Sequence, residues 1–393
     1  MTILRGRNFL MTPGPTNIPD RILTAMHRPA VDLYSDSFID LCKSCIEDLP
    51  SLFGTESDVF IFPSNGHGAW EGALANPLPP GARVLIPETG FFATTWSRAA
   101  DGLGLTSTII ESDGRSPVST DLIGDYLEKD VAQNIDAILL VHVDTASGLQ
   151  SDVVAIRRIL DNLEHPALLI VDAVASLGGS EFKMDEWGVD VTVAASQKAL
   201  MLPPGFGFNA VNEKAMKRRR QNDRELYYWD WERRQSSQWY DWFCGSAPEH
   251  LIFGLREALD MVLEEGMDLV VNRHYRLSRA VLAAVEVWSK GGAMERNVKL
   301  EKDCSNTVTT VLLDEKYDPI ELVRYLSQKL NVSFGGGLGG LIGKAFRIAH
   351  MGDINEPMIL GALGCVEHAL RVKQIPHGAG GVEAAIASLS IVK

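Results

Sequence analysis

Three short segments place a polar or charged group among small residues where a strand is expected to end. The first is Pro63-Ser64-Asn65-Gly66-His67-Gly68-Ala69. Its glycines would let backbone N–H groups approach an anion, and a following helix would add its dipole, so a phosphate fits here. An ordinary strand-to-helix turn, with Asn65 or Ser64 as the N-cap of that helix, explains the same residues. Taken alone, this segment favours the ordinary turn over the phosphate site.

The second segment carries one carboxylate, Asp172, at the end of an apolar run in Val171-Asp172-Ala173-Val174-Ala175-Ser176. Burying a carboxylate costs free energy unless it meets a cation or several hydrogen-bond donors. A protonated pyridine nitrogen is such a cation, and the pairing would hold the ring in its electron-withdrawing form. A carboxylate that only accepts from loop amides is an equal alternative.

The third segment, Ala195-Ser196-Gln197-Lys198-Ala199-Leu200, places a lysine among apolar and small residues. These surroundings disfavour the ammonium form and leave an amine that can form an imine with an aldehyde. A surface lysine at a strand end suits such neighbours less well. In order along one sheet, the segments describe a phosphate turn, a carboxylate for a ring nitrogen and an imine-forming lysine.

The elements that must position these segments follow an α/β pattern. β-rich apolar runs at 59–62, 83–86, 107–110, 137–141, 167–171 and 189–193 alternate with helical patterns at 66–77, 91–102, 120–130 and 152–163. This alternation is typical of a parallel sheet with crossover helices. A long helical pattern over 248–290, strands at 307–313 and 345–349 and a helix near 318–330 predict a second, α+β unit. We expect an arm over 1–20, a large domain over 21–247 and a small domain over 248–393.

Composition limits the partners. The chain has 393 residues and a net charge of −14, which favours two domains and disfavours nucleic acid or an anionic membrane surface as partner. The basic run 217–220 is interpreted as a solvated helix face, and the aromatic stretch 227–242 as a candidate subunit interface. No run of about 18 apolar residues predicts a membrane span, and no signal-peptide core is found, so the cytoplasm is the expected location. The five cysteines show no metal-binding spacing, and no metal is expected.

Together, the motifs resemble those of the alanine/serine–glyoxylate aminotransferase group, which are fold-type I, class-V enzymes that use pyridoxal 5′-phosphate (PLP). The likeness extends from Pro13-Gly14-Pro15-Thr16 to the C-terminal helices, and 171–179, 196–198 with 203–205, and 343–348 carry it. It implies a fold-type I α/β architecture, with a mostly parallel sheet in the large domain and a smaller α+β C-terminal domain. The implied reaction is ping-pong transfer of an amino group from a small L-amino acid, with serine or alanine favoured, to a 2-oxo acid, with glyoxylate favoured. A donor or acceptor of the aspartate–glyoxylate or pyridoxamine–pyruvate type is the alternative.

The resemblance also implies roles for single residues. Lys198 would hold PLP as a Schiff base, and Asp172 would pair with the pyridine nitrogen. Arg347 would grip the substrate α-carboxylate with a two-pronged hydrogen bond, and Gly14 and Tyr34 would lie at the substrate mouth. The other implied cofactor contacts are Asn65, Gly66 and His67 at the phosphate turn, Phe92 on the ring face, Thr145 near the ring oxygen, Gln197 beside the phosphate, and Ser246 reaching the partner's phosphate in a homodimer with shared active sites.

Two places depart from the family pattern. Phe243 and Ser246 stand where members often have a tyrosine and a threonine, and Phe243 cannot donate the tyrosine's hydrogen bond, so Tyr240 is a possible substitute. Leu33 and Tyr34 replace the His-Arg pair of many serine–glyoxylate enzymes and would alter the substrate mouth. The amino donor is therefore the part of the function that the sequence defines least.

Three rival interpretations fit the sequence less well. Gly335, Gly337 and Gly340 match G-x-G-x-x-G, but this motif lies late in the chain and precedes a strand, whereas a dinucleotide site needs it to open a helix. A PLP lyase or desulfurase would need a group posed over the substrate, and nothing around Cys244, Cys304 or Cys365 suggests one. A non-catalytic binding protein would not need the imine-forming lysine together with the ring-nitrogen carboxylate.

Overall fold

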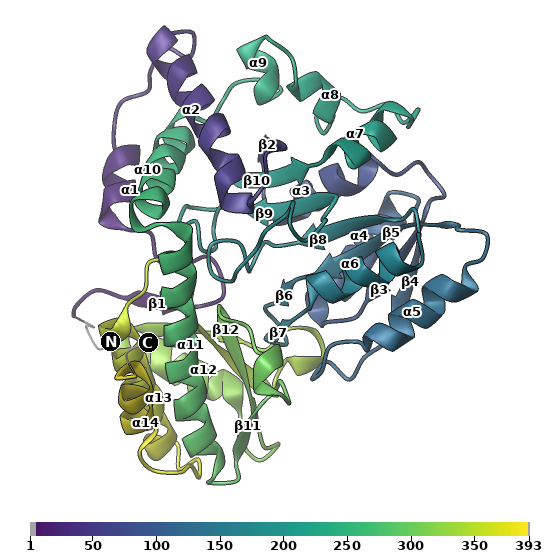
Figure 1. Ribbon diagram of the computed structural model, residues 1–393. Coiled ribbons are helices and arrows are strands. Elements are labelled where there is room, and N and C mark those ends of the chain that lie inside the picture. The colour runs from purple at the N-terminus through teal and green to yellow at the C-terminus, as the bar shows by residue number, and fades with distance from the viewer. Residues whose placement is uncertain (1–4, 392–393) are drawn as a thin grey trace.

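Two sheets organise the computed structural model, which describes residues 5–391 (Figure 1). The larger sheet has seven strands in the order β2-β10-β9-β8-β5-β3-β4. Its strands are β2 (Asp58–Pro63), β3 (Arg83–Pro87), β4 (Thr106–Ile110), β5 (Ile135–Val141), β8 (Leu168–Asp172), β9 (Val191–Ala195) and β10 (Phe206–Val211). Only β10 runs antiparallel to its neighbours, so the prediction of a mostly parallel α/β sheet is confirmed.

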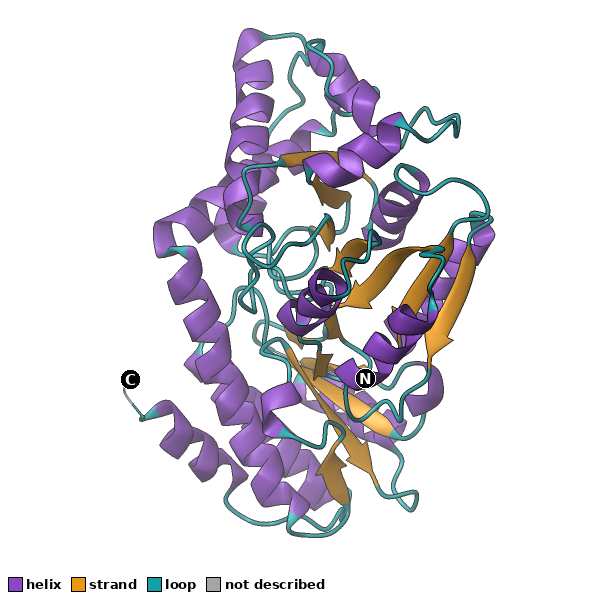
Figure 2. Cartoon of the chain, turned by 45° about the vertical axis from the view of Figure 1, so that its right-hand side comes forward, coloured by secondary structure: helices purple, strands orange, loops and turns teal. Residues whose placement is uncertain are grey.

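Crossover helices flank this sheet (Figure 2). They are α3 (Gly66–Ala75), α4 (Phe91–Gly102), α5 (Thr120–Lys129) and α6 (Val153–Asn162), each within a few residues of its predicted bounds. All residues of β8, β9 and β10 are buried, as the covering of both faces of a parallel sheet requires. The crossover order places the carboxyl ends of β5, β8 and β9 at one edge of the sheet.

The smaller sheet has five strands in the order β1-β13-β14-β12-β11. These are β1 (Phe9–Met11), β11 (Met294–Arg296), β12 (Val308–Leu313), β13 (Val332–Gly336) and β14 (Ala345–Ala349), with the helices α12 (Pro319–Leu330), α13 (Glu356–Val372) and α14 (Gly381–Leu389). The N-terminal arm contributes β1, which pairs in parallel with β13. The arm is therefore bound to a sheet that is otherwise built from residues near the other end of the chain.

Several elements differ from the sequence-based expectations. The long helical pattern over 248–290 is two helices, α10 (Glu249–Glu265) and α11 (Met267–Ser289), because Gly266 between them has a φ of +83°. Helices α1 (Asp20–Met26) and α2 (Asp36–Phe53) were not predicted, and α10 packs against both. Short strands β6 (Val143–Asp144) and β7 (Leu149–Gln150) form a hairpin directly after β5.

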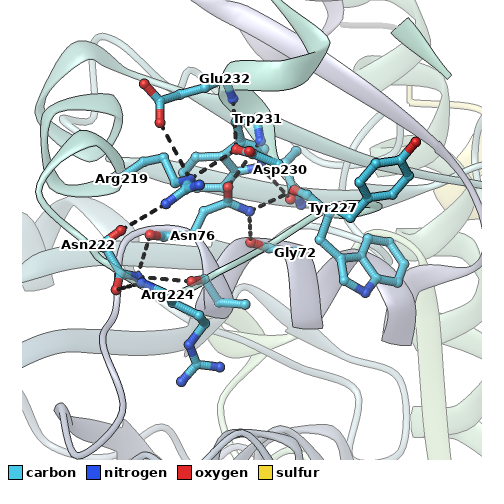
Figure 3. A network of polar contacts seen from close by, with 12 residues as sticks. Gly72, Asn76, Arg219, Asn222, Arg224, Tyr227, Asp230, Trp231 and Glu232 are labelled. Carbon is cyan, nitrogen blue, oxygen red and sulfur yellow. Dashed lines mark hydrogen bonds and ion pairs between the residues drawn. The ribbon is translucent and has the colours of Figure 1, made fainter. Parts of the chain in front are cut away.

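The basic run belongs to α7 (Glu213–Arg220), which is followed by α8 (Trp231–Arg234) and α9 (Trp239–Trp242). The prediction of a solvated face is wrong for Arg219, which is buried. Its Nε donates to Asp230 at 3.0 Å and its Nη1 donates to the Asn222 carbonyl at 3.0 Å (Figure 3). This arginine ties α7 to the start of α8, because a buried guanidinium must satisfy its donors within the protein.

The aromatic stretch 227–242 divides between core and surface. Trp231 is buried and stacks on Phe60, with ring centroids 6.1 Å apart. Tyr227 and Tyr240 are exposed. Across residues 5–391, no helix combines the length and the apolar character that crossing a membrane requires.

Candidate functional site

A cavity of about 260 Å³ lies at the carboxyl edge of the larger sheet, beside the N-terminus of α3. It brings together most of the predicted cofactor residues. Its lining consists of Asn65, Gly66, His67, Trp70, Phe92, Val143, Thr145, Asp172, Val174, Ala175, Gln197, Lys198 and Pro204. The segments are far apart in the sequence and meet here because parallel strands end at the same edge.

The turn before α3 both caps the helix and lines the cavity. The Asn65 side chain accepts from the N–H groups of His67 at 3.1 Å and Gly68 at 3.2 Å. A Cβ on Gly66 would lie 3.2 Å from Val174 Cγ2, so a larger residue would crowd the cavity wall. The capping alternative is therefore correct in its geometry, and the same helix end faces the cavity with its positive dipole.

Asp172 ends β8 and is 4% exposed. One carboxylate oxygen accepts from Trp70 Nε1 at 2.9 Å and the other from the Val174 N–H at 2.7 Å. Burial raises the pKa of Asp172 to about 6, and the nearby Asp144 carboxylate acts in the same direction. Both hydrogen-bond donors to Asp172 are neutral, and Lys198 acts on it through its charge without a hydrogen bond, so among the described residues this buried acid faces the cavity without a bonded cation.

Lys198 follows β9, and its ammonium group is buried against the N-terminal arm. Its Nζ donates to the Pro13 carbonyl, and its own carbonyl accepts from the Thr16 hydroxyl at 2.8 Å. A Cβ on Gly14 would lie 2.7 Å from Nζ. Burial, followed by the positive charge of Arg347, lowers the pKa of Lys198 to about 8, which favours a neutral amine.

Arg347, at the middle of β14, links the smaller sheet to the β6–β7 hairpin that follows β5. Its Nε donates to the Gly336 carbonyl at 2.6 Å, and its Nη1 donates to the Thr145 carbonyl at 3.0 Å. The guanidinium is buried, and burial lowers its pKa to about 10. Arg347 does not line the cavity itself, but it holds Thr145, which does.

Asp144 is a buried residue of this region that the sequence patterns did not single out. Its carboxylate accepts from the Phe92 N–H at 2.9 Å and from the Ala146 N–H at 2.9 Å. It thereby caps α4 and holds the backbone of Phe92 at the cavity wall. A Cβ on Gly90 would lie 3.0 Å from this carboxylate, so only glycine leaves it room. The signal was available, because Asp144 closely follows the apolar run 137–141 much as Asp172 ends its own run.

Besides Arg347 and Gly14, two further predicted residues, Tyr34 and Ser246, are not part of the cavity lining. Tyr34 is 67% exposed and packs edge-on against Trp239, with centroids 5.3 Å apart. Ser246 is exposed. Phe243 is a core residue at 1% exposure.

The rival sites receive no support from the geometry. The glycine-rich stretch 335–340 begins in β13, continues into a single 3-10 turn (Gly339–Leu341) and leads to β14, and no long helix starts there. No cysteine is among the described residues that line the cavity. A larger cavity of about 700 Å³, lined in part by His142, Trp187 and Lys302, contains neither the lysine nor the carboxylate of the smaller one.

Comparisons with known proteins agree with this geometry. The family model described as Aminotransferase class-V matches residues 9–340. The chain is 40% identical to a serine–glyoxylate aminotransferase of Methylorubrum extorquens, over 93% of this chain and 91% of the relative. It is 38% identical to the serine–glyoxylate aminotransferase of Arabidopsis thaliana, with the same coverage.

A solved structure extends the likeness to the fold. The crystal structure of an alanine–glyoxylate aminotransferase from Nostoc sp. superposes with a TM-score of 0.84 at 26% identity, covering 94% of this chain and 97% of that chain. The architecture is therefore that of fold-type I aminotransferases, as the sequence motifs predicted. With a family model that spans most of the chain and relatives that match nearly its full length, this protein belongs to the class-V aminotransferase family.

Proposed function

We propose that this aminotransferase binds PLP in the 260 Å³ cavity and transfers the amino group of a small L-amino acid, serine or alanine by preference, to glyoxylate. The observation that carries the proposal is the placement of the Lys198 amine and the Asp172 carboxylate on one cavity at the N-terminus of α3. The names of the sequence relatives support serine as donor and glyoxylate as acceptor.

The residues present suit this cofactor in charge and in shape. The Asp172 carboxylate, buried without a cation, would pair with the ring nitrogen, and the start of α3 would receive the phosphate. The side-chain amide oxygen of Gln197 is buried and has no partner among the described residues, as expected where a ligand completes the hydrogen bonds. The cavity is slightly smaller than most small-molecule pockets, about 300–1,000 Å³, and suits a single substituted ring.

Each step of the proposed reaction depends on a particular residue of this chain. When bound, PLP supplies an aldehyde that bonds to an amine and a ring that accepts the electron pair left at the substrate α-carbon. Lys198 would hold that aldehyde and, as a free amine after an incoming amine has displaced it, would take the proton from the substrate α-carbon and return it at C4′ of the cofactor. Asp172 would keep the ring nitrogen protonated, and Phe92, which also lines the cavity, would stack on the ring.

Substrate binding rests on the smaller sheet. Arg347 orients the α-carboxylate with two parallel N–H groups, a task for which a planar guanidinium is suited. Its bond to the Thr145 carbonyl sets its distance from the cavity, where the Thr145 hydroxyl would contact the ring oxygen. Because donor and acceptor both carry an α-carboxylate, they would use this arginine in turn, and the kinetics should be ping-pong.

A homodimer with shared active sites is part of the proposal. Ser246 is exposed and away from the cavity of its own chain, as suits a residue that reaches the partner's phosphate. Tyr240, which is 44% exposed, is available for the hydrogen bond that Phe243 cannot donate. Mixing Lys198→Ala with Ser246→Glu subunits should restore activity, since one site of each mixed dimer is intact. An enzyme that turns over as a monomer in sedimentation would contradict the shared site.

We also propose a cytoplasmic location. All five cysteines are free thiols, as suits a reducing compartment.

A half-reaction screen tests the proposed reaction. The aldehyde form is mixed with single amino acids, and its absorbance is followed as it converts to the amine form. Serine or alanine should convert it fastest, glyoxylate should reverse the conversion, and no ammonia should be released. Release of ammonia or sulfide would instead identify a lyase or a desulfurase.

A variant pair tests the lysine. Lys198→Ala should lower turnover on the order of 10⁴-fold while circular dichroism stays unchanged, because the amine both holds the cofactor and moves the proton. The matched control is Lys183→Ala, which removes a surface lysine paired with Glu181 and Glu186. Near-normal activity of Lys198→Ala, or loss of borohydride-reducible chromophore in the control, would refute the assignment.

A further inference from the structure

We propose that Trp70 is a positioning residue that fixes the Asp172 carboxylate through its indole N–H and thereby strengthens the hold of that carboxylate on a bound ring nitrogen. The second half of this statement rests on the proposed function, whereas the first concerns the ligand-free protein alone. Neither the capping turn nor the motif around Asp172 requires a tryptophan at this position.

The contact is direct and shielded from water. Trp70 Nε1 lies 2.9 Å from Asp172 Oδ2, and both residues are almost completely buried. The Val174 N–H occupies the other oxygen at 2.7 Å. Each oxygen therefore has one fixed donor, and the orientation of the carboxylate plane is determined by two contacts from different elements, α3 and the loop after β8.

The indole cannot easily turn away from this carboxylate. Trp96 stacks on it with centroids 5.5 Å apart and an angle of 18° between the rings. His67 packs on it at 4.5 Å, and Phe92 meets it nearly edge-on at 6.4 Å. Trp70 thus contacts the start of α3, the aromatic wall of the cavity and the buried acid, and it fixes the positions of these three parts relative to one another.

The charges around Asp172 make the hydrogen bond from the indole important for keeping the carboxylate ionised. Burial raises the pKa of this carboxyl, and Asp144 raises it further, while the two hydrogen-bond donors and the charge of Lys198 lower it. Burial lowers the pKa of His67, which packs on the indole, and so disfavours its charged form. A hydrogen bond to a buried carboxylate stabilises its charged form, so loss of the indole N–H should favour the protonated form.

Trp96 provides a matched control within the same stack. It is fully buried, and its indole nitrogen has no hydrogen-bond partner among the described residues. Trp70→Phe and Trp96→Phe remove the same atoms from adjoining rings, but only Trp70→Phe removes a donor from Asp172. Any effect that comes from lost packing alone should therefore be similar in the two variants.

The test follows the Asp172 carboxyl by ¹³C NMR in the ligand-free protein. Trp70→Phe should raise its pKa from about 6 to about 7 or above, and Trp96→Phe should leave it unchanged. The dissociation constant for PLP, measured by equilibrium binding, should rise about tenfold in Trp70→Phe and less than twofold in Trp96→Phe. An unchanged Asp172 titration in Trp70→Phe, or equal effects in both variants, would overturn the inference.

A second measurement leaves Trp70 unchanged, so it remains valid even if the Trp70→Phe variant fails to fold. In the ¹H–¹⁵N spectrum, the Trp70 indole resonance should move with the Asp172 titration, and Asp172→Asn should abolish that movement. An indole resonance of Trp70 that does not shift as Asp172 titrates would refute the contact. If the indole follows Asp172 but the wild-type protein transfers no amino group, the proposed function fails and the role of Trp70 in holding the carboxylate stands.

Discussion

Gly14 lies against Lys198 so closely that a Cβ at position 14 would stand 2.7 Å from the lysine Nζ. The glycine also has a φ of +101°, which other residues rarely adopt. Its place in the arm is fixed, because Thr16, two residues later, bonds to the Lys198 carbonyl at 2.8 Å. The arm and the lysine therefore share space that only glycine leaves free.

Gly14→Ala should lower kcat/KM about 100-fold or more, because either the lysine or the arm must move out of position. Steady-state kinetics and PLP binding measure this. The control is Gly6→Ala, which changes another arm glycine of positive φ with no atom within 4 Å of the added Cβ. A comparable loss in Gly6→Ala would show that backbone strain, and not contact with the lysine, causes the effect.

Capture of PLP by the ligand-free protein should depend on pH through the Lys198 amine. Burial lowers the pKa of Lys198 to about 8, so the neutral, reactive fraction should increase about tenfold per pH unit below 8 and level off above it. Asp172 has a pKa of about 6 and is therefore already ionised when the Lys198 ammonium group loses its proton near pH 8. Stopped-flow absorbance measures the capture rate. A rate that keeps rising beyond pH 10 would indicate an ordinary, hydrated lysine.

Asp172→Asn should stabilise the ligand-free protein at neutral pH while impairing catalysis. The folded-state pKa is raised from 3.8 to about 6, so the native state binds more protons than the unfolded state in this window, and stability falls as pH rises through it. Removing the charge should raise the free energy of unfolding by up to about 3 kcal/mol at pH values above 6.

Urea unfolding of the ligand-free protein checks this prediction. The gain should be present at pH 7 and should vanish near pH 4, where the native carboxyl is protonated. Asp152→Asn, at the exposed cap of α6, should change stability little at either pH, since asparagine caps helices as well as aspartate. A destabilised Asp172→Asn at pH 7 would mean that its two hydrogen bonds outweigh the cost of burial.

Arg347→Lys should lower kcat/KM about 100-fold for donor and acceptor alike, because an ammonium group cannot make two parallel bonds to a carboxylate. It would also lose the bonds to the Gly336 and Thr145 carbonyls. Arg279→Lys, which keeps a cation opposite the exposed Glu301 at a half-buried position, serves as control and should be near wild type. A loss confined to the donor half-reaction would exclude a shared carboxylate site.

The sequence by itself determined the alternation of strands and crossover helices in the larger sheet and the positions of its functional strand ends. These signals are local: an apolar run followed by Asp172, or by Ser196-Gln197-Lys198, needs only the rule that parallel strands end at one edge. The same locality explains the error at Gly266, since one glycine inside a helical pattern does not reveal whether the helix continues or breaks.

Tertiary structure alone decided which distant groups meet. Gly14 reaches Lys198 because β1 is held in the smaller sheet. Trp70 reaches Asp172 across the interface of α3 with the larger sheet. Arg347 of the smaller sheet reaches Thr145 in the β6–β7 hairpin. Such contacts depend on register and side-chain packing over the whole molecule, to a precision of an ångström or less. Periodicity and residue type carry no such distances, which is why the sequence located the chemistry and the packing determined its geometry.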